Sequence, residues 1–343
     1  MEYTDRRTFL KTIAMGGVGA FLMAACGDSS SSSPTASSAS SGSTSSTAEM
    51  RQLAFQAAWI NDAEFIGYFI GIDNGYYSDE GLEIDYLSGG PDVIPESSLL
   101  SGRAPIALTT PDTTIKAISE DGAKLKIIGT QFQKNPIGVV SLVESGINSP
   151  QDLVGKTLAV PPVNTLSVEA MFRLNDIDPA DVNIVPYQFD PTPLIKREID
   201  ASLDFTVNVP FSIREAGEEA TSFLLYDYGF TTYNDTVVVT EEALNERRDD
   251  LVKFLRASRR GWNENFQDLD KYPAMFGSTW FSGTGRSVAN ETFYNNAARD
   301  LIDHPNGVYT MTEEDIAANL EALASIGING DRDMFDTTLL EEI

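Results

Sequence analysis

The chain has 343 residues and a formal net charge of −27, because 51 Asp and Glu residues outnumber 24 Lys and Arg residues. This charge argues against a nucleic-acid partner, since phosphates are bound by lysine and arginine. The single histidine and single cysteine cannot supply the several ligands of a zinc site, and no Gly-x-Ser-x-Gly motif accompanies the histidine. We therefore expect neither an enzyme nor a metal or other cofactor.

Residues 1–25 have the pattern of an export signal. Arg6 and Arg7, which give it a twin-arginine character, precede an apolar run too short to span a bilayer. The segment Leu22–Cys26 resembles a bacterial lipobox, so we expect cleavage before Cys26 and a lipid on its sulfur. Two acyl chains are enough for stable anchoring. The alternative is that Cys26 is an incidental residue of an ordinary signal or of an N-terminal membrane anchor.

Residues 26–49 are dominated by serine, with threonine, alanine and glycine. Such a segment cannot bury apolar surface and is expected to be a flexible tether. The remaining residues are numerous enough for two lobes with separate cores. We therefore expect a folded domain held at the extracytoplasmic face of the cell membrane, in the periplasm or at the cell surface.

Strand-like and helix-like segments alternate after the tether. In chain order, strands are expected at 53–58, 82–87, 106–108 and 125–128, and helices at 61–74, 96–100 and 115–120. The pattern restarts after residue 136 with a helix at 166–174 and five further strands. These strands, expected at 139–143, 156–160, 182–187, 203–207 and 236–239, would form a second sheet. From residue 241 onward the sequence is mainly helical. This alternation predicts an α/β fold of two lobes, each a mostly parallel sheet flanked by helices.

Three segments also carry a family resemblance. They read NGYYSDEGLEI at 74–84, SGRAPI at 101–106 and GINSPQDLVGKTLAV at 146–160. They resemble elements of the type II periplasmic solute-binding proteins of ABC importers, in the group that binds nitrate, sulfonate, taurine and thiamine pyrimidines. One departure is Pro105, which stands where the family usually has Asp.

The resemblance implies two lobes that close on a ligand. Residues 50–136 and 240–343 would form lobe 1, and residues 137–239 would form lobe 2. Asn135-Pro136 and Val239-Thr240 are the expected hinge crossovers. The implied partners are a small-molecule ligand and the permease of an ABC importer with its cytoplasmic ATPase, and the implied state is a monomer.

The ligand of an open α/β sheet binds beyond the carboxyl ends of the strands. The first expected strand ends at Trp59, which offers a flat face to a planar ring, and Asn61 and Glu64 can read the edge of that ring. In relatives that bind thiamine-pyrimidine precursors, a Trp-x-x-Asn arrangement resembles this stretch. The alternative is that Trp59 packs between sheet and helix and that Asn61 caps the helix.

Other strand ends supply the remaining expected ligand contacts, each of which also suits a cap or turn. They are Thr109, Thr110 and Asp112 in the first lobe and Asn164, Thr165, Asn208 and Phe211 in the second, with Gln131 and Tyr187 as weaker choices. These loops contain no clustered Arg or Lys, which disfavours an anionic ligand.

The sequence therefore predicts a lipid-anchored binding protein for a planar heterocyclic vitamin or precursor, of the thiamine-pyrimidine or riboflavin class. A sulfonate, taurine or nitrate ligand is the alternative within the same fold. The alternative class is an enzyme resembling a thiamine-pyrimidine synthase, which is disfavoured because the chain lacks suitable His and Cys residues.

Overall fold

The computed structural model describes residues 50–343. The expected export signal, the lipidation site Cys26 and the serine-rich tether lie outside the described residues. The described residues form one compact unit. Within the described part of the chain, no helix combines the length and the apolar character needed to cross a membrane.

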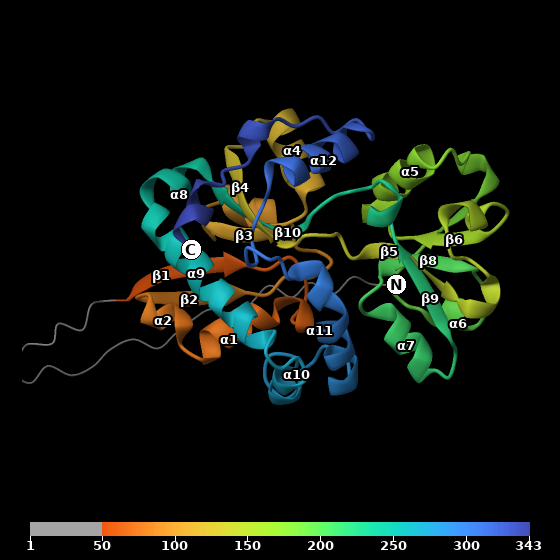
Figure 1. Ribbon diagram of the computed structural model, residues 1–343, viewed down its shortest axis with the longest axis horizontal. Helices are drawn as coiled ribbons and strands as arrows, with labels where there is room; N and C mark the ends of the chain where they lie inside the picture. The colour runs from red at the N-terminus through yellow and green to blue at the C-terminus, as the bar shows by residue number, and fades with distance from the viewer. Residues whose placement is uncertain (1–49) are drawn as a thin grey trace, which may run out of the picture. The chain divides into compact units, whose positions relative to one another are not determined.

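The first sheet contains five strands in the order β2-β1-β3-β10-β4 (Figure 1). The strands are β1 Arg51–Gln56, β2 Leu82–Leu87, β3 Ile106–Thr109, β4 Leu125–Phe132 and β10 Asn234–Thr240. β1 pairs in parallel with β2 and β3, whereas β10 runs antiparallel to β3 and β4. β3 is apolar and buried along its length, as expected of a strand with both faces covered.

The second sheet repeats this arrangement in the order β7-β6-β8-β5-β9. Its strands are β5 Ile137–Leu142, β6 Thr157–Val160, β7 Asn183–Pro186, β8 Ala201–Phe205 and β9 Ala220–Leu224. β6 is parallel to β7 and β8, and β5 is antiparallel to β8 and β9. Each sheet thus has one antiparallel strand in the fourth place, which confirms the predicted fold of two mostly parallel sheets.

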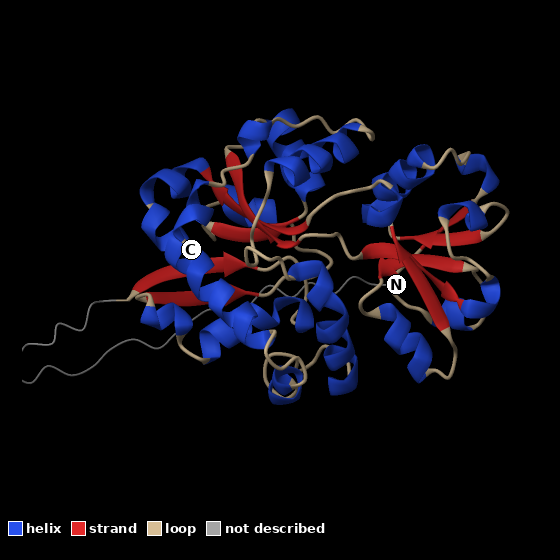
Figure 2. Cartoon of the chain, viewed as in Figure 1, coloured by secondary structure: helices blue, strands red, loops and turns tan. Residues whose placement is uncertain are grey.

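Helices cover both sheets (Figure 2). They are α1 Ile66–Asp73, α2 Tyr76–Asp79, α3 Pro95–Leu100, α4 Pro111–Asp121, α5 Thr165–Leu174, α6 Thr192–Ile195, α7 Val209–Glu215, α8 Glu241–Glu246, α9 Arg248–Asn265, α10 Lys271–Phe276, α11 Val288–Ile302 and α12 Glu313–Ala324. α9 packs closely on α1, because a Cβ at Gly261 would lie 2.0 Å from the carbonyl oxygen of Gly67. The ring of Trp262 covers Gly67 in the same contact and is fully buried.

The strand expected at 236–239 exists as β10, but it lies in the first sheet and not in the second. Alternation and β-branched residues identify a strand without identifying its neighbours. Here Val237, Val238 and Val239 are completely buried between β3 and β4. The second connection between the sheets therefore runs from β9 to β10 over residues 225–233, ahead of the expected hinge at Val239-Thr240.

The two connections between the sheets lie side by side. Asn135 is in the first, between β4 and β5, and its Nδ2 donates to Thr232 Oγ1 in the second at 3.1 Å. The backbone N–H of Asn135 also donates to the carbonyl oxygen of Thr232 at 3.1 Å. The two crossovers are therefore joined by hydrogen bonds at the position where lobe rotation would occur.

Candidate functional site

A cavity of about 250 Å³, the main pocket, lies between the two sheets. The segments after β1 and β3, the start of β10, and residues within and just before α11 line one side. The start of β5, the segments after β6 and β7, and the end of β8 with the residues after it line the other. Its lining residues are Ala58, Trp59, Asp62, Glu64, Thr110, Ile137, Asn164, Phe189, Leu203, Asp204, Phe205, Asn208, Val209, Asn234, Asp235, Arg286 and Tyr294. Residues associated with both sheets thus contribute to one cavity.

Two aromatic rings face each other across the main pocket. Trp59 follows β1 and Phe189 follows β7, and their ring centroids lie 5.5 Å apart at an interplanar angle of 59°. Phe189 is exposed and has a φ of 59°, in the left-handed region that non-glycine residues seldom adopt. Strained backbone of this kind is frequent at ligand sites, where the surrounding structure holds it in place.

A pair of buried carboxyl groups forms part of the opposite wall. Tyr294 donates its hydroxyl hydrogen to Glu64 Oε2 at 3.1 Å, and Gln131 Nε2 donates to Asp235 Oδ2 at 3.1 Å and to the Glu64 carbonyl at 2.8 Å. Burial, together with the nearby charge of Asp235, raises the pKa of Glu64 well above its usual value. Burial also raises the pKa of Asp235 to about 7. Both carboxyl groups are therefore protonated more readily than exposed ones.

Asp204 supplies a carboxyl group from the second lobe. It is almost completely buried at the end of β8, where Ser202 Oγ donates to its Oδ2 at 3.0 Å. Burial raises the pKa of Asp204 to about 7. Within residues 50–343, no group of His, Cys, Asp and Glu side chains is arranged to hold a metal ion. Each of these carboxyl groups can accept a hydrogen bond, and each can donate one when it is protonated.

Arg286 is the one basic side chain among the described lining residues of the main pocket. Its guanidinium pairs with Asp62 and lies 3.9 Å from Glu291 Oε1. Glu291 Oε2 in turn accepts from the backbone N–H of Ala63 at 2.8 Å. The positive charge of the Arg286 guanidinium is thus already balanced by the carboxyl groups of Asp62 and Glu291.

Two amide oxygens in the cavity wall lack partners. Asn208 Oδ1 and Asn234 Oδ1 are buried and form no hydrogen bond with any residue from 50 to 343. A buried acceptor without a donor costs free energy, so both oxygens favour a donor that arrives with the ligand or with water. The main pocket is therefore rich in acceptors.

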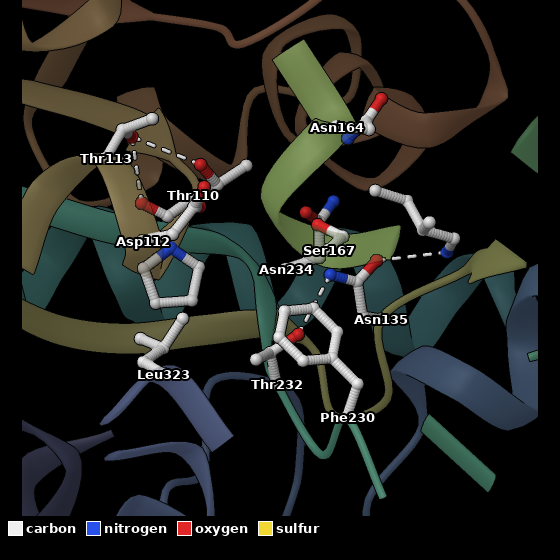
Figure 3. A pocket seen from close by; sticks show the side chains of 12 residues that line it. Thr110, Asp112, Thr113, Asn135, Asn164, Ser167, Phe230, Thr232, Asn234 and Leu323 are labelled. Carbon is white, nitrogen blue, oxygen red and sulfur yellow. Dashed lines mark hydrogen bonds between the residues drawn. The ribbon is translucent and has the colours of Figure 1, made fainter. Parts of the chain in front are cut away.

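The structure brings six of the ten expected contact residues to the cleft. Trp59, Glu64, Thr110, Asn164 and Asn208 line the main pocket. Asp112 lines a smaller cavity beside it, of about 120 Å³, which we call the side chamber (Figure 3). Thr110, Ile137, Asn164 and Asn234 line both cavities.

The other expected residues lie elsewhere. The Thr109 hydroxyl is buried in the sheet, 2.6 Å from Thr114 Oγ1. Thr165 is exposed and donates to the Pro162 carbonyl at 3.0 Å, and the Phe211 ring packs on Phe293 at 5.4 Å. Asn61 is outside the lining, Gln131 lies behind Glu64, and the Tyr187 ring lies 6.0 Å from that of Phe189.

Sequence reasoning missed several residues that line the main pocket: Asp62, Phe189, Asp204, Asp235, Arg286 and Tyr294. Asp62 lies between Asn61 and Glu64, which the sequence analysis named as ligand contacts, so its place after the first strand could have identified it. Arg286 and Tyr294 come from the C-terminal helical segment, which carries no strand end to mark them.

The comparisons with known proteins agree with this architecture. The model of the family described as "NMT1/THI5 like" matches residues 62–271. A formylaminopyrimidine-binding protein of Halalkalibacterium halodurans is 26% identical over 219 residues, which cover 62% of this chain and 66% of that protein, slightly under two thirds. A riboflavin-binding protein, RibY, of Chloroflexus aurantiacus is 22% identical and covers 76% of each chain.

One relative has an enzyme's name. It is a 4-amino-5-hydroxymethyl-2-methylpyrimidine phosphate synthase of Legionella pneumophila, 28% identical over 54% of this chain and 60% of that protein.

Among solved structures, the periplasmic aliphatic sulphonate binding protein SsuA from Escherichia coli aligns with a TM-score of 0.62 at 13% identity, over 80% of this chain and 91% of that chain. Identity this low shows the fold alone. The family resemblance predicted from the three sequence segments is confirmed: the chain belongs to the NMT1/THI5-like family and has the fold of the periplasmic binding proteins.

Proposed function

We propose that this protein is the solute-binding component of an ABC importer and that it captures a small planar heterocycle of the thiamine-pyrimidine or riboflavin class. The observation that carries the proposal is the composition of the main pocket, in which two aromatic faces stand beside a wall of acceptor oxygens. A ring with amino or N–H groups matches both features.

The aromatic pair supplies affinity for the ring faces. Stacking of a heterocyclic base on an aromatic side chain contributes about 1–3 kcal/mol. Trp59 is held on the first lobe and Phe189 on the second, so a ring bound between them links the two lobes. Ligand binding would then favour the closed arrangement, because only that arrangement provides both contacts.

The carboxyl and amide oxygens supply selectivity at the ring edge. The main pocket is lined by three carboxyl groups with raised pKa values, those of Glu64, Asp204 and Asp235. Each can accept a hydrogen bond when ionised and donate one when protonated. An aminopyrimidine presents an exocyclic donor beside a ring nitrogen, which suits a carboxyl group with its two oxygens. The acceptors Asn208 Oδ1 and Asn234 Oδ1 would take further donors from the ligand.

A sulfonate, taurine or nitrate ligand is the second candidate. It shares the fold, but an anion would face four carboxyl-bearing residues in the main pocket, and Arg286 is already paired with Asp62 and Glu291. Bringing an anion there would require Arg286 to exchange one of these partners. The electrostatics therefore favour the heterocycle.

An enzymatic role has less support in the described residues. His304 Nδ1 accepts from the backbone N–H of Asn306 at 3.1 Å in a surface turn, and this histidine is not among the residues that line the main pocket. The relatives named as formylaminopyrimidine-binding and riboflavin-binding proteins match 62% and 76% of this chain, and the relative named as a synthase matches 54%. Recognition and delivery suit the site better than chemistry does.

The export signal, lipidation of Cys26 and the tether are part of the same proposal. They would hold a monomeric binding domain at the extracytoplasmic face, near the importer's permease and its cytoplasmic ATPase. Mass spectrometry of the N-terminal peptide tests this part. A diacylated peptide that begins at Cys26 would support it, and an unmodified chain that begins elsewhere would contradict it.

Thermal denaturation with a ligand panel tests the binding role. The panel contains 4-amino-5-hydroxymethyl-2-methylpyrimidine, formylaminopyrimidine, riboflavin, taurine and nitrate. A ligand at 100 times its Kd adds about 2.7 kcal/mol to the free energy of unfolding, which is readily detected as a higher Tm. A heterocycle should raise the Tm; a rise with taurine or nitrate and none with any heterocycle would overturn the proposal.

A further inference from the structure

The side chamber opens beside the main pocket and has a different chemistry. Eight of its twelve lining residues carry a hydroxyl, amide or carboxyl group, and no Lys or Arg is among them. The polar members are Thr110, Asp112, Thr113, Asn135, Asn164, Ser167, Thr232 and Asn234. The main pocket, in contrast, has four apolar aliphatic residues and four aromatic rings beside its carboxyl groups.

Two helix N-termini meet at the side chamber. Thr110 precedes α4 and Asn164 precedes α5, and neither side chain caps its own helix within the described residues. In Figure 3, Thr110, Asp112 and Thr113 lie on one side of the chamber and Asn164 on the other. In the first turn of α4 the N–H groups of Asp112 and Thr113 have no partner within the helix, whereas Pro111 has no N–H and the Thr165 N–H of α5 already donates to the Pro162 carbonyl.

Asn234 supplies an independent acceptor in the same wall. Its side chain is 98% buried, and its Oδ1 has no hydrogen-bond partner among residues 50–343. Asn234 lines the side chamber and the main pocket, so a donor on a ligand that fills them is a candidate partner for this oxygen. The Asp112 carboxyl adds a second acceptor that is partly accessible.

This mixture selects against charged groups. An anion would meet Asp112 with no Lys or Arg in the lining to balance it, and a cation would face the positive ends of two helices. A neutral group that both donates and accepts matches the chamber, because it can take hydrogen bonds from N–H groups and give them to Asn234 and Asp112. Hydroxyl groups have this property.

On the basis of the proposed function, we infer that the side chamber is a subsite for a hydroxyl-bearing substituent of the heterocycle whose ring lies in the main pocket. Four residues line both cavities, so the two spaces adjoin, and the proposal places one ligand across both. The main pocket recognises the ring, and the side chamber distinguishes rings that carry hydroxyl groups from rings that do not.

Matched ligand pairs test this subsite by calorimetric titration of the purified protein. One pair is riboflavin and lumiflavin, in which a methyl group replaces the hydroxylated chain. The other is 4-amino-5-hydroxymethyl-2-methylpyrimidine and 4-amino-2,5-dimethylpyrimidine. In a pair that binds, we expect the Kd of the hydroxylated ligand to be at least about ten-fold lower than that of its partner. A ligand without the hydroxyl group leaves buried polar groups of the chamber unpaired.

Equal affinity within a pair whose members both bind would overturn the subsite and leave the proposed function standing. If neither pair binds, the subsite fails; the proposed function fails as well only if no heterocycle of the thermal-denaturation panel binds. The two failures are therefore distinguishable.

Variants at Ser167 and Asp112 locate the effect, since both residues line the side chamber and not the main pocket. Ser167→Ala and Asp112→Asn should each reduce the advantage of the hydroxylated ligand about three- to ten-fold, with little change for the bare ring. Ser167→Leu should fill the chamber and remove the advantage. Thr165→Ala is the matched control, because this neighbouring threonine is exposed and outside the lining. A variant that weakens both members of a pair equally would contradict the assignment.

Discussion

The rings of Trp59 and Phe189 lie 5.5 Å apart at an angle of 59°, although the two residues belong to different sheets of the fold. Phe189 stands in a left-handed backbone conformation and remains exposed. The tilt leaves each ring with a face that is not stacked on the other. For a planar ligand to stack on both, the rings must first separate from this contact; the ligand then replaces one tilted contact with stacking on two faces.

Truncation of either ring should weaken ligand binding. Trp59→Ala should raise the Kd for the bound heterocycle about ten- to hundred-fold, because one stacking contact is worth about 1–3 kcal/mol. Phe189→Ala should have an effect of the same kind. Isothermal titration calorimetry measures both, with Tyr228→Ala as control, an aromatic residue outside the lining of the main pocket. Unchanged affinity in Trp59→Ala would exclude stacking on this ring.

Arg286 should be important for stability, since its partner Asp62 is fully buried and Arg286 is 20% exposed. Arg286→Met would leave two buried carboxyl groups without their cation, which should lower the free energy of unfolding by about 3 kcal/mol. Urea denaturation measures this loss. Arg197→Met is the matched control, because Arg197 pairs with Glu144 and Glu218 at the surface and should change stability little. Equal effects of the two substitutions would contradict the burial argument.

The stability of the ligand-free protein should depend on pH through Asp204. Burial raises the pKa of this carboxyl group to about 7 in the folded state, from an ordinary value of 3.8, so the folded state binds more protons between these two values. Stability should therefore fall as the pH rises through this window, by on the order of a few kcal/mol from this group.

Asp204→Asn removes that titration, so its stability should decline less steeply with rising pH. The decline should not vanish, because burial also raises the pKa values of Asp235 and Glu291 to about 7. Urea denaturation at several pH values between about 4 and 8 compares the two proteins across the window. Parallel stability curves for the wild type and the variant would show that Asp204 does not titrate in this range.

A contact between α7 and α11 should favour the closed arrangement. Phe211 packs on Phe293 at 5.4 Å, and Asn290 Nδ2 donates to Ser212 Oγ at 3.2 Å, away from the lining of the main pocket. Phe293→Ala should raise the Kd about three- to ten-fold, mainly through faster ligand release, because an aromatic pair contributes about 0.5–1.5 kcal/mol. Stopped-flow measurements give the rate. Thr292→Ala, in the same helix, is the control; equal release rates in the wild type and Phe293→Ala would refute the contact's role.

The periodic parts of the sequence predicted nine of the ten strands that the structure describes, and β9 at Ala220–Leu224 was missed. The segment expected at 53–58 is β1 at Arg51–Gln56, and the one expected at 182–187 is β7 at Asn183–Pro186. In these segments the side-chain pattern reports burial directly. The partners of a strand depend on contacts far apart in the chain, which is why β10 was assigned to the wrong sheet.

The site was predictable where it lies next to a strand end, as at Trp59 and Glu64. It was not predictable at Arg286, which reaches the pocket from a loop more than 200 residues after its partner Asp62. Nor does any local pattern show that Phe189 adopts a positive φ, since phenylalanine has no intrinsic preference for that conformation. Tertiary contacts decide both features.

The most direct test of the central claim uses tryptophan fluorescence. The chain has three tryptophans, and only Trp59 is among the lining residues of the main pocket; Trp262 is buried in the core and Trp280 stacks on Phe69. Titration with 4-amino-5-hydroxymethyl-2-methylpyrimidine or riboflavin should change the emission of the wild type in a saturable way. Trp59→Phe should remove most of this change while the ligand still binds by calorimetry, and taurine should produce no change in either protein. Saturable binding of taurine with no response to either heterocycle would contradict the account.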